Sequence, residues 1–144
     1  MYPSHDKDVY GWAVHTAQLL KEKKMNEVDF DGIIEELEGM GRSDEYELMN
    51  RLSLVISHLL KWQFQPNMRS HSWTYTIREQ RKQATIHMRK NPSLKSQLNE
   101  ILADAYDVAI SKAAKETAPF FEEPDLYMFS TEPKPALLLN GESV

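Results

Sequence analysis

Apolar side chains recur every three or four residues along most of the chain, which is the spacing of one face of an α-helix. No long stretch alternates apolar and polar positions as a half-buried strand does. The pattern predicts an all-α protein, an up-and-down bundle of four to five helices over residues 1–117. Residues 118–144 contain four of the seven prolines and several aromatic residues, so we expect an irregular C-terminal strap packed on the bundle.

Two helices are predicted before the middle of the chain. The first covers about residues 6–24. The second should start at Asp29 or Asp31, either of which can cap it, and should end or kink at Gly39 and Gly41. The expected core face of the first helix consists of Tyr10, Ala13, Ala17 and Leu20, widened by Trp12, Thr16 and Leu19.

The clearest amphipathic pattern begins near Ser43 and predicts the core helix. Its apolar seam consists of Leu48, Leu52, Val55, Leu59 and Trp62, with Met49, Ile56 and Leu60 beside it. Pro66 ends this helix, because its ring removes a backbone donor and disfavours helix at the preceding residue.

Two further helices are predicted after Pro66. The fourth runs from Ser70 or Ser72 to about Lys90, and its apolar face is thin, with only Trp73, Ile77, Ala84 and Met88. A cap at Asn91 followed by Pro92 predicts a fifth helix that reaches about residue 117.

Composition narrows the chemistry. The absence of cysteine excludes disulfides, thiolate nucleophiles and cysteine-ligated metal sites. No apolar run is long enough for a secretion signal or a membrane span, so we expect a cytoplasmic protein without membrane contact. None of the five histidines follows a glutamate at the spacing used by di-iron bundles, and no phosphate-binding loop is present. We therefore expect no cofactor and no metal.

Charge is segregated along the chain, although the net charge is only −5. Residues 1–60 carry six basic against twelve acidic residues, residues 61–90 carry seven against one, and residues 91–144 carry four against nine. A basic middle between acidic arms has two explanations. It contacts either the carboxylates of the chain itself or an external anion.

Several motifs resemble a bacterial family of small helical proteins known as domain-of-unknown-function family twenty-nine. They are Tyr10-x-Trp12, Ile34-Glu35-Glu36-Leu37-Glu38 with Met40-Gly41-Arg42-Ser43, His58-Leu59-Leu60-Lys61-Trp62-Gln63-Phe64-Gln65, Ser72-Trp73-x-x-Thr76-Ile77-x-x-Gln80-Arg81, and Pro92-Ser93-Leu94. The resemblance covers about residues 8–116, and the departures from the family pattern lie mainly after Ala118. It implies an all-helical fold and no known activity, so it provides no catalytic residues.

The internal explanation of the basic segment leads to a specific hypothesis. On a helical wheel Arg81 borders the apolar face of the fourth helix, and Arg78 lies on the adjoining strip. Glu36 and Glu38 flank the apolar side of the second helix. We expect one of these glutamates to pair with Arg78 or Arg81 across a helix interface and to fix which helices are neighbours.

The external explanation treats the same segment as a surface that binds single-stranded RNA or DNA. The residues that would bind are Lys61, Phe64, Arg69, His71, Tyr75, Arg78, Arg81, Lys82 and Arg89. Trp62 and Trp73 continue the apolar faces of their helices, and we assign both to the core. Phe64, Tyr75 and residues 67–71 are the expected exposed positions.

A hydrolytic or metal activity is a third hypothesis. Some helical ribonucleases use an arginine followed by a histidine after four to six intervening residues, and Arg51 with His58 and Arg81 with His87 fit this spacing. Chance alone gives about 0.6 such pairs in a chain of 144 residues with six arginines and five histidines, so two pairs carry little information and we name no catalytic residues. The sequence predicts a non-catalytic, cytoplasmic interaction protein that associates with itself, through the polar face of the fourth helix, or with another protein. Nucleic-acid binding is the alternative.

Overall fold

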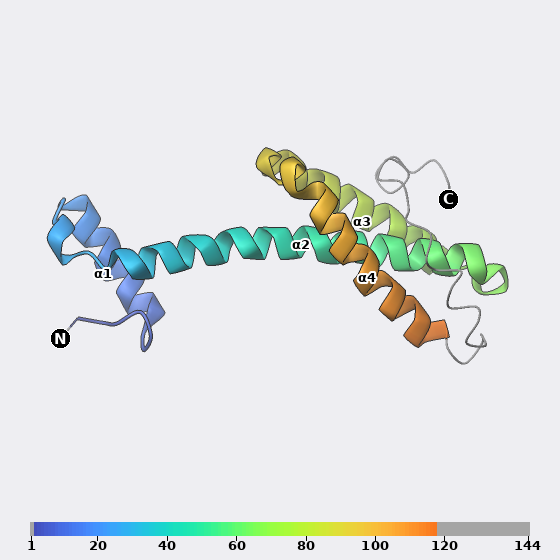
Figure 1. Ribbon diagram of the computed structural model, residues 1–144, viewed down its shortest axis with the longest axis horizontal. Helices are drawn as coiled ribbons and strands as arrows, with labels where there is room; N and C mark the ends of the chain where they lie inside the picture. The colour runs from blue at the N-terminus through green and yellow to red at the C-terminus, as the bar shows by residue number, and fades with distance from the viewer. Residues whose placement is uncertain (1, 118–144) are drawn as a thin grey trace. The chain divides into compact units, whose positions relative to one another are not determined.

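The computed structural model describes residues 2–117, and this part of the chain is helical without any strand (Figure 1). Its elements are α1 (Val9–Lys21), the 3-10 helix η1 (Met25–Glu27), α2 (Phe30–Phe64), η2 (Pro66–Met68), α3 (His71–Lys90), η3 (Pro92–Gln97) and α4 (Leu98–Thr117). The all-α class predicted from the sequence is confirmed. The predicted C-terminal strap lies outside the described residues.

The chain divides into two compact units, which we call unit 1 (Met1–Ser43) and unit 2 (Asp44–Val144). Unit 1 contains α1, η1 and the start of α2, and unit 2 contains the rest of α2 with α3 and α4. Within residues 2–117, no helix combines the length and the apolar composition that a membrane span requires.

The buried face of α1 differs from the prediction. Trp12, Thr16 and Leu19 are buried, whereas Tyr10 is 82% exposed and Leu20 is 39% exposed. Ala13 and Ala17 of the predicted face are exposed as well. The burial of Trp12 and Leu19 in place of Ala13 and Ala17 follows from side-chain size, because the two larger side chains remove more apolar surface from water. Trp12 Nε1 also donates a hydrogen bond of 3.1 Å to Asp29 Oδ2.

Both ends of α2 lie where the sequence predicts them, but the helix is not interrupted between its two ends. Asp29 Oδ1 accepts a hydrogen bond of 3.0 Å from the Gly32 amide, so Asp29 is the cap. The helix then continues through Gly39 and Gly41 to Phe64, and the predicted end at these glycines is wrong. A glycine destabilises a helix by about 1 kcal/mol but does not prevent helix formation. Here the backbone hydrogen bonds of the neighbouring turns keep the two glycines helical.

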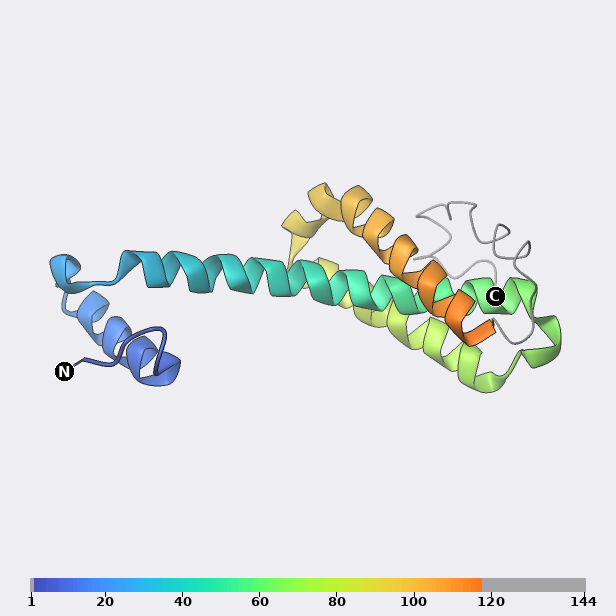
Figure 2. The same cartoon turned by 60° about the horizontal axis from the view of Figure 1, so that its bottom comes forward.

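The core of unit 2 lies between α2, α3 and α4 (Figure 2). Leu48, Leu52, Val55, Ile56 and Leu60 contribute to it from α2, as predicted. Ile77, Ala84 and Met88 contribute from α3, and Ile101, Ala105, Tyr106, Ala109 and Ala113 from α4. Unit 2 therefore has a continuous core of the size expected for a stable helical domain.

Side-chain hydrogen bonds form at both ends of α3. Ser70 caps α3 through a hydrogen bond of 3.3 Å from the Trp73 amide, as one of the two predicted caps. Asn91, in contrast, donates from its side chain to the His87 carbonyl at 3.0 Å and so closes α3. The six residues of η3 follow it, and α4 begins only at Leu98, later than predicted.

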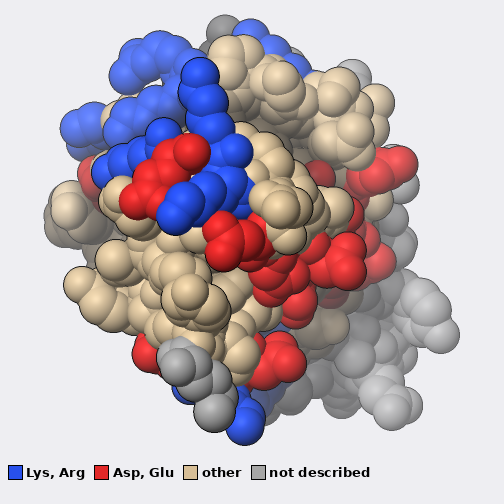
Figure 3. All heavy atoms as spheres, turned by 90° about the vertical axis from the view of Figure 1, so that its left-hand side faces the viewer, with Lys and Arg blue, Asp and Glu red and all other residues tan. Residues whose placement is uncertain are grey.

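Charged side chains of both signs adjoin on the surface. On the face drawn in Figure 3, Lys and Arg side chains gather at the upper left, and Asp and Glu side chains lie directly beside and below them. The segregation of charge along the sequence therefore does not give this face a single sign.

Candidate functional site

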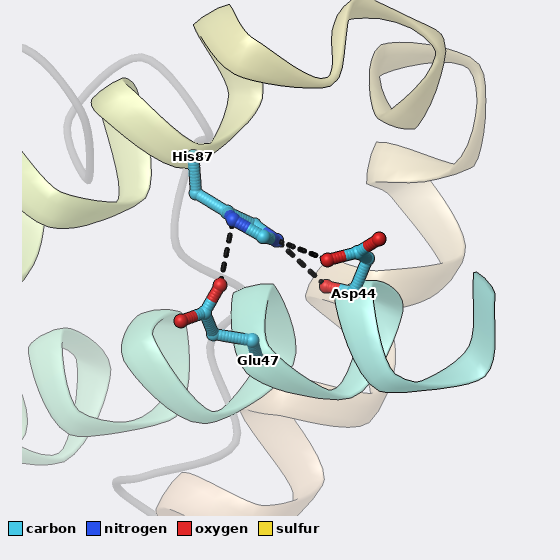
Figure 4. Close-up of side chains that lie close together, drawn as sticks. All are labelled: Asp44, Glu47 and His87. Atoms are coloured by element: carbon cyan, nitrogen blue, oxygen red, sulfur yellow. Dashed lines mark hydrogen bonds and ion pairs between the residues drawn. The ribbon is translucent and has the colours of Figure 1, made fainter. Parts of the chain in front are cut away.

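His87 lies between two carboxylates at the contact of α2 and α3 (Figure 4). Its Nδ1 is 2.6 Å from Glu47 Oε2. Its Nε2 is 3.0 Å from the Asp44 carbonyl oxygen and 3.7 Å from Asp44 Oδ1. Only 10% of the His87 side chain is exposed. Both ring nitrogens face acceptors, which a doubly protonated imidazole satisfies because it donates from both.

The three side chains are of the types that bind transition metals, and one ligand atom of each lies within 4.8 Å of the others. Their placement does not suit a metal ion. The two carboxylates lie at opposite nitrogens of the ring (Figure 4), whereas a single ion binds at only one nitrogen. The cluster is better suited to hold α2 and α3 together.

Arg51 shares the Glu47 carboxylate with His87. Arg51 Nη2 is 3.2 Å from Glu47 Oε1, and Arg51 Nη1 donates to Gln80 Oε1 of α3 at 3.2 Å. Arg51 Nε is buried and has no hydrogen-bond partner among the described residues. Polar contacts from His87 to α2 and from Arg51 to Gln80 thus connect α2 and α3. The sequence pointed to Arg51 and His87 only as members of arginine–histidine pairs and did not predict these contacts.

The predicted partners Glu36 and Glu38 lie in unit 1. Glu36 Oε1 is 2.6 Å from His5 Nε2, and this hydrogen bond is the largest of the effects that raise the pKa of His5 above its usual value. The predicted pairing with Arg78 or Arg81 would join the two units and stays a prediction.

The arginine–histidine pairs point to different partners. Arg51 contacts Glu47 and Gln80, whereas His58 Nδ1 bonds the Leu54 carbonyl at 2.8 Å, and burial lowers the pKa of His58. In the second pair His87 faces α2, while Arg81 is buried and desolvation lowers its pKa. Neither arrangement presents an arginine and a histidine together to a substrate.

Two cations of the predicted nucleic-acid surface contact the protein itself. The Lys61 Nζ is 2.6 Å from Glu116 Oε2 and 5.2 Å from the ring centre of Trp73. Arg69 Nε donates to the Trp62 carbonyl at 2.8 Å, and its guanidinium lies 4.9 Å from the Trp62 ring centre. Each cation thereby covers one face of a tryptophan.

The aromatic residues of the same stretch are distributed differently from the prediction. Trp62 and Trp73 are half-buried and stand outside the core cluster, so their assignment to the core is wrong. Phe64, predicted to be exposed, is partly buried against the core. Tyr75 is 66% exposed, and residues 67–71, including His71, are exposed as predicted.

The remaining basic residues form a row on α3. We call Tyr75, Arg78, Lys82 and Arg89 the α3 basic strip, because all four are exposed and lie on one side of the helix. Lys82 and Arg89 also border a depression of about 340 Å³ with Arg81, Thr85 and Ile86. Within the described residues, no ion pair joins Arg78, Lys82 or Arg89 to a carboxylate.

Unit 1 exposes an apolar row on α2. Phe30, Ile34, Leu37 and Met40 are 52%, 51%, 61% and 63% exposed, and we call them the α2 apolar stripe. The sequence indicated an apolar side of this helix that includes Ile34, Leu37 and Met40, but it did not predict that this side is exposed. Their spacing was visible in the sequence, but spacing alone does not tell a core face from an exposed one.

The fold and these sites define a small all-α protein that joins its helices through buried ionic contacts and exposes separate apolar and basic rows. The chain belongs to the family described as domain of unknown function DUF29, whose model matches residues 4–133. The resemblance seen in the sequence motifs is thereby confirmed. No curated protein and no solved structure matches the chain.

Proposed function

We propose that the protein is a non-catalytic interaction protein that self-associates through the α2 apolar stripe. The observation that carries this proposal is the imbalance of unit 1, which buries Trp12 and Leu19 but exposes ten large apolar side chains. They are Tyr2, Val9, Tyr10, Val14, Leu20, Met25, Phe30, Ile34, Leu37 and Met40. The described part of unit 2 buries ten large apolar side chains and exposes three. Large exposed apolar patches mark interaction sites.

The stripe continues the apolar side of α2 beyond the part that the core covers. Leu37 and Leu48 are three helical turns apart, so they lie on the same side of the helix. Leu48 is fully buried in the core of unit 2, whereas Leu37 is 61% exposed. A second protein surface that covers the stripe would extend to unit 1 the burial that α3 and α4 provide in unit 2.

The cluster of Asp44, Glu47 and His87 supports a non-catalytic role. Both nitrogens of His87 are occupied by acceptors, and the Glu47 carboxylate is shared between His87 and Arg51. A general base needs a free nitrogen or oxygen within reach of its substrate. We place this interaction protein in the bacterial cytoplasm, a reducing compartment that suits a chain without cysteine.

Nucleic-acid binding has weaker support. Lys61 and Arg69 contact internal groups, which leaves Arg78, Lys82 and Arg89 for phosphates. The net charge of −5 also repels polyanions at long range.

The test is the mass of the protein in solution, measured by light scattering over a range of concentrations. The stripe is small, so we expect weak association, in the range of roughly 10 to 100 µM. Leu37→Asp should keep the protein monomeric, because a carboxylate would have to be buried in the interface. A wild-type protein that stays monomeric throughout this range would contradict the proposal.

Tyr46→Asp is the matched control. Tyr46 lies on α2 and is 61% exposed, as Leu37 is, but nine residues separate them and place them on opposite sides of the helix. We expect this variant to associate like the wild type. Equal helix content by circular dichroism would show that both variants are folded.

A further inference from the structure

We propose that the surface of the second copy that receives the α2 apolar stripe is the α3 basic strip. This inference rests on the proposed self-association and names both sides of the contact. The two rows belong to different parts of the chain, so the contact joins unlike surfaces of two copies.

The first argument is complementary charge. Residues 30–42 contain four acidic residues, Asp31, Glu35, Glu36 and Glu38, and one basic residue, Arg42. The α3 basic strip contains three exposed cations, and the only acidic residue of α3 is Glu79. Opposite charges bordering an apolar contact direct the association and select its partner.

The second argument is that two copies of the stripe repel each other. If α2 packed against α2 of another copy, the carboxylates of Glu36 and Glu38, which flank the apolar side, would approach those of the other copy. Like charges placed together across an interface disfavour it. A receiving surface rich in Lys and Arg removes this repulsion, and the chain has such a surface on α3.

The third argument is shape and chemistry along the two helices. The stripe extends over ten residues, about 15 Å, and the strip over fourteen, about 21 Å, at 1.5 Å per residue. The stems of Arg78 and Lys82 are aliphatic and can cover apolar side chains while their charged ends reach outward. Tyr75, 66% exposed, adds an aromatic ring to the same row.

The groups that would pair are available. Arg78, Lys82 and Arg89 have no ion pair among the described residues, and neither have Asp31 and Glu38. All five side chains are exposed. Because every copy has one stripe and one strip, the contact leaves an unused surface of each kind, and association can continue beyond a dimer.

The experiment mixes two variants that each lack one surface. Leu37→Asp lacks the stripe, and Lys82→Glu with Arg89→Glu lacks the strip. Each variant alone should be monomeric. Mixed in equal amounts they should form a one-to-one dimer and nothing larger, because the first still has its strip and the second still has its stripe. Light scattering measures the mass, and circular dichroism confirms the fold.

Lys95→Glu is the control for the charge changes, since Lys95 is exposed on η3 outside the strip. This variant should associate like the wild type. Association of the wild type should also weaken as salt is raised from about 50 to about 200 mM, because the contact joins exposed charges.

The possible failures are distinguishable. If the double variant of α3 associates like the wild type while Leu37→Asp does not, self-association stands and α3 is not the receiving surface. If each variant alone is monomeric and the mixture is monomeric too, the stripe of one copy does not dock on the strip of another, and this inference is wrong. A wild type that never associates overturns both proposals. Salt-sensitive binding of labelled single-stranded RNA that the α3 variant loses, with its mass unchanged, would assign the strip to nucleic acid instead.

Discussion

Three histidines among the described residues differ in the number of carboxylates near the imidazole ring and in burial. His5 has carboxylates of Asp6, Glu35 and Glu36 within 3.7 Å. His58 has no carboxylate contact of that kind, and burial dominates its environment. His87 lies between Glu47 and Asp44 and connects two helices.

The first two histidines should titrate on opposite sides of the usual value of about 6.5. The hydrogen bond to Glu36 raises the pKa of His5, and burial lowers the pKa of His58. The contribution of His5 to stability is therefore complete below about pH 6.5 and lost as the pH rises through its raised pKa. The contribution of His58 is complete above about pH 6.5 and lost as the pH falls toward its lowered pKa.

Proton NMR of the imidazole signals measures both midpoints in one titration. His5→Gln and His58→Gln assign the two signals. Midpoints in the reverse order, with His58 titrating above His5, would show that the described contacts do not determine these values.

Residue types were easier to predict than residue contacts. Pairing of the basic middle with carboxylates of the chain was one of two explanations from the sequence, and within the described residues Lys61 with Glu116 is a contact of that kind. Arg69 instead contacts the carbonyl and the ring of Trp62. The particular partners depend on which turns of α2 and α3 face each other. That depends on the packing of Leu48, Leu52 and Ile77, and no local pattern encodes it.

Helix ends were predicted best where a single capping residue or proline determines them. Asp29 caps α2, Pro66 follows its end, and Ser70 caps α3. The predicted break at Gly39 and Gly41 was wrong because neither glycine adopts a backbone conformation that a helix cannot. Glycine signals a helix end through the left-handed conformation at the position after the helix, and α2 does not use it here.

The glycines of α2 should respond differently to an added methyl group. A Cβ at Gly41 would meet nothing within 4 Å, so Gly41→Ala should raise the free energy of unfolding by about 1 kcal/mol. A Cβ at Gly32 would lie 2.5 Å from Asp29 Oδ2 and 2.7 Å from Trp12 Cζ2. Gly32→Ala should therefore lower the stability of unit 1.

Urea unfolding followed by circular dichroism compares the two variants on the same helix. Because the propensity of alanine is the same at both positions, any difference between them reports the space around each glycine. A Gly32→Ala variant as stable as Gly41→Ala would mean that Trp12 does not approach α2 closely.

At the scale of the whole molecule the two units differ in how much apolar surface they bury. Unit 2 has a core built from three helices, whereas unit 1 buries only Trp12 and Leu19 among its large apolar side chains. Composition and periodicity predicted the all-α class correctly. They could not predict this imbalance, because the pattern of Phe30, Ile34 and Leu37 is the same whether or not another helix covers it.

Backbone amides should exchange faster in unit 1 than in unit 2, because local stability follows the apolar contacts that opening would expose. Hydrogen exchange measured by mass spectrometry should show less protection in residues 9–21 and 30–41 than in residues 48–60 and 77–88. At high protein concentration, protection of residues 30–41 should increase if copies associate there. Equal protection of all four segments at low concentration would contradict the assigned difference.

The three tryptophans divide between the two units, one in unit 1 and two in unit 2. Trp12 is 7% exposed and hydrogen-bonded to Asp29, whereas Trp62 and Trp73 are half-buried beneath Arg69 and Lys61. The indole of unit 1 is therefore more shielded from water than the two indoles of unit 2. We expect the opening of unit 1 to shift the emission of Trp12 to longer wavelength, so the protein contains its own fluorescent reporter of that unit, without any attached dye.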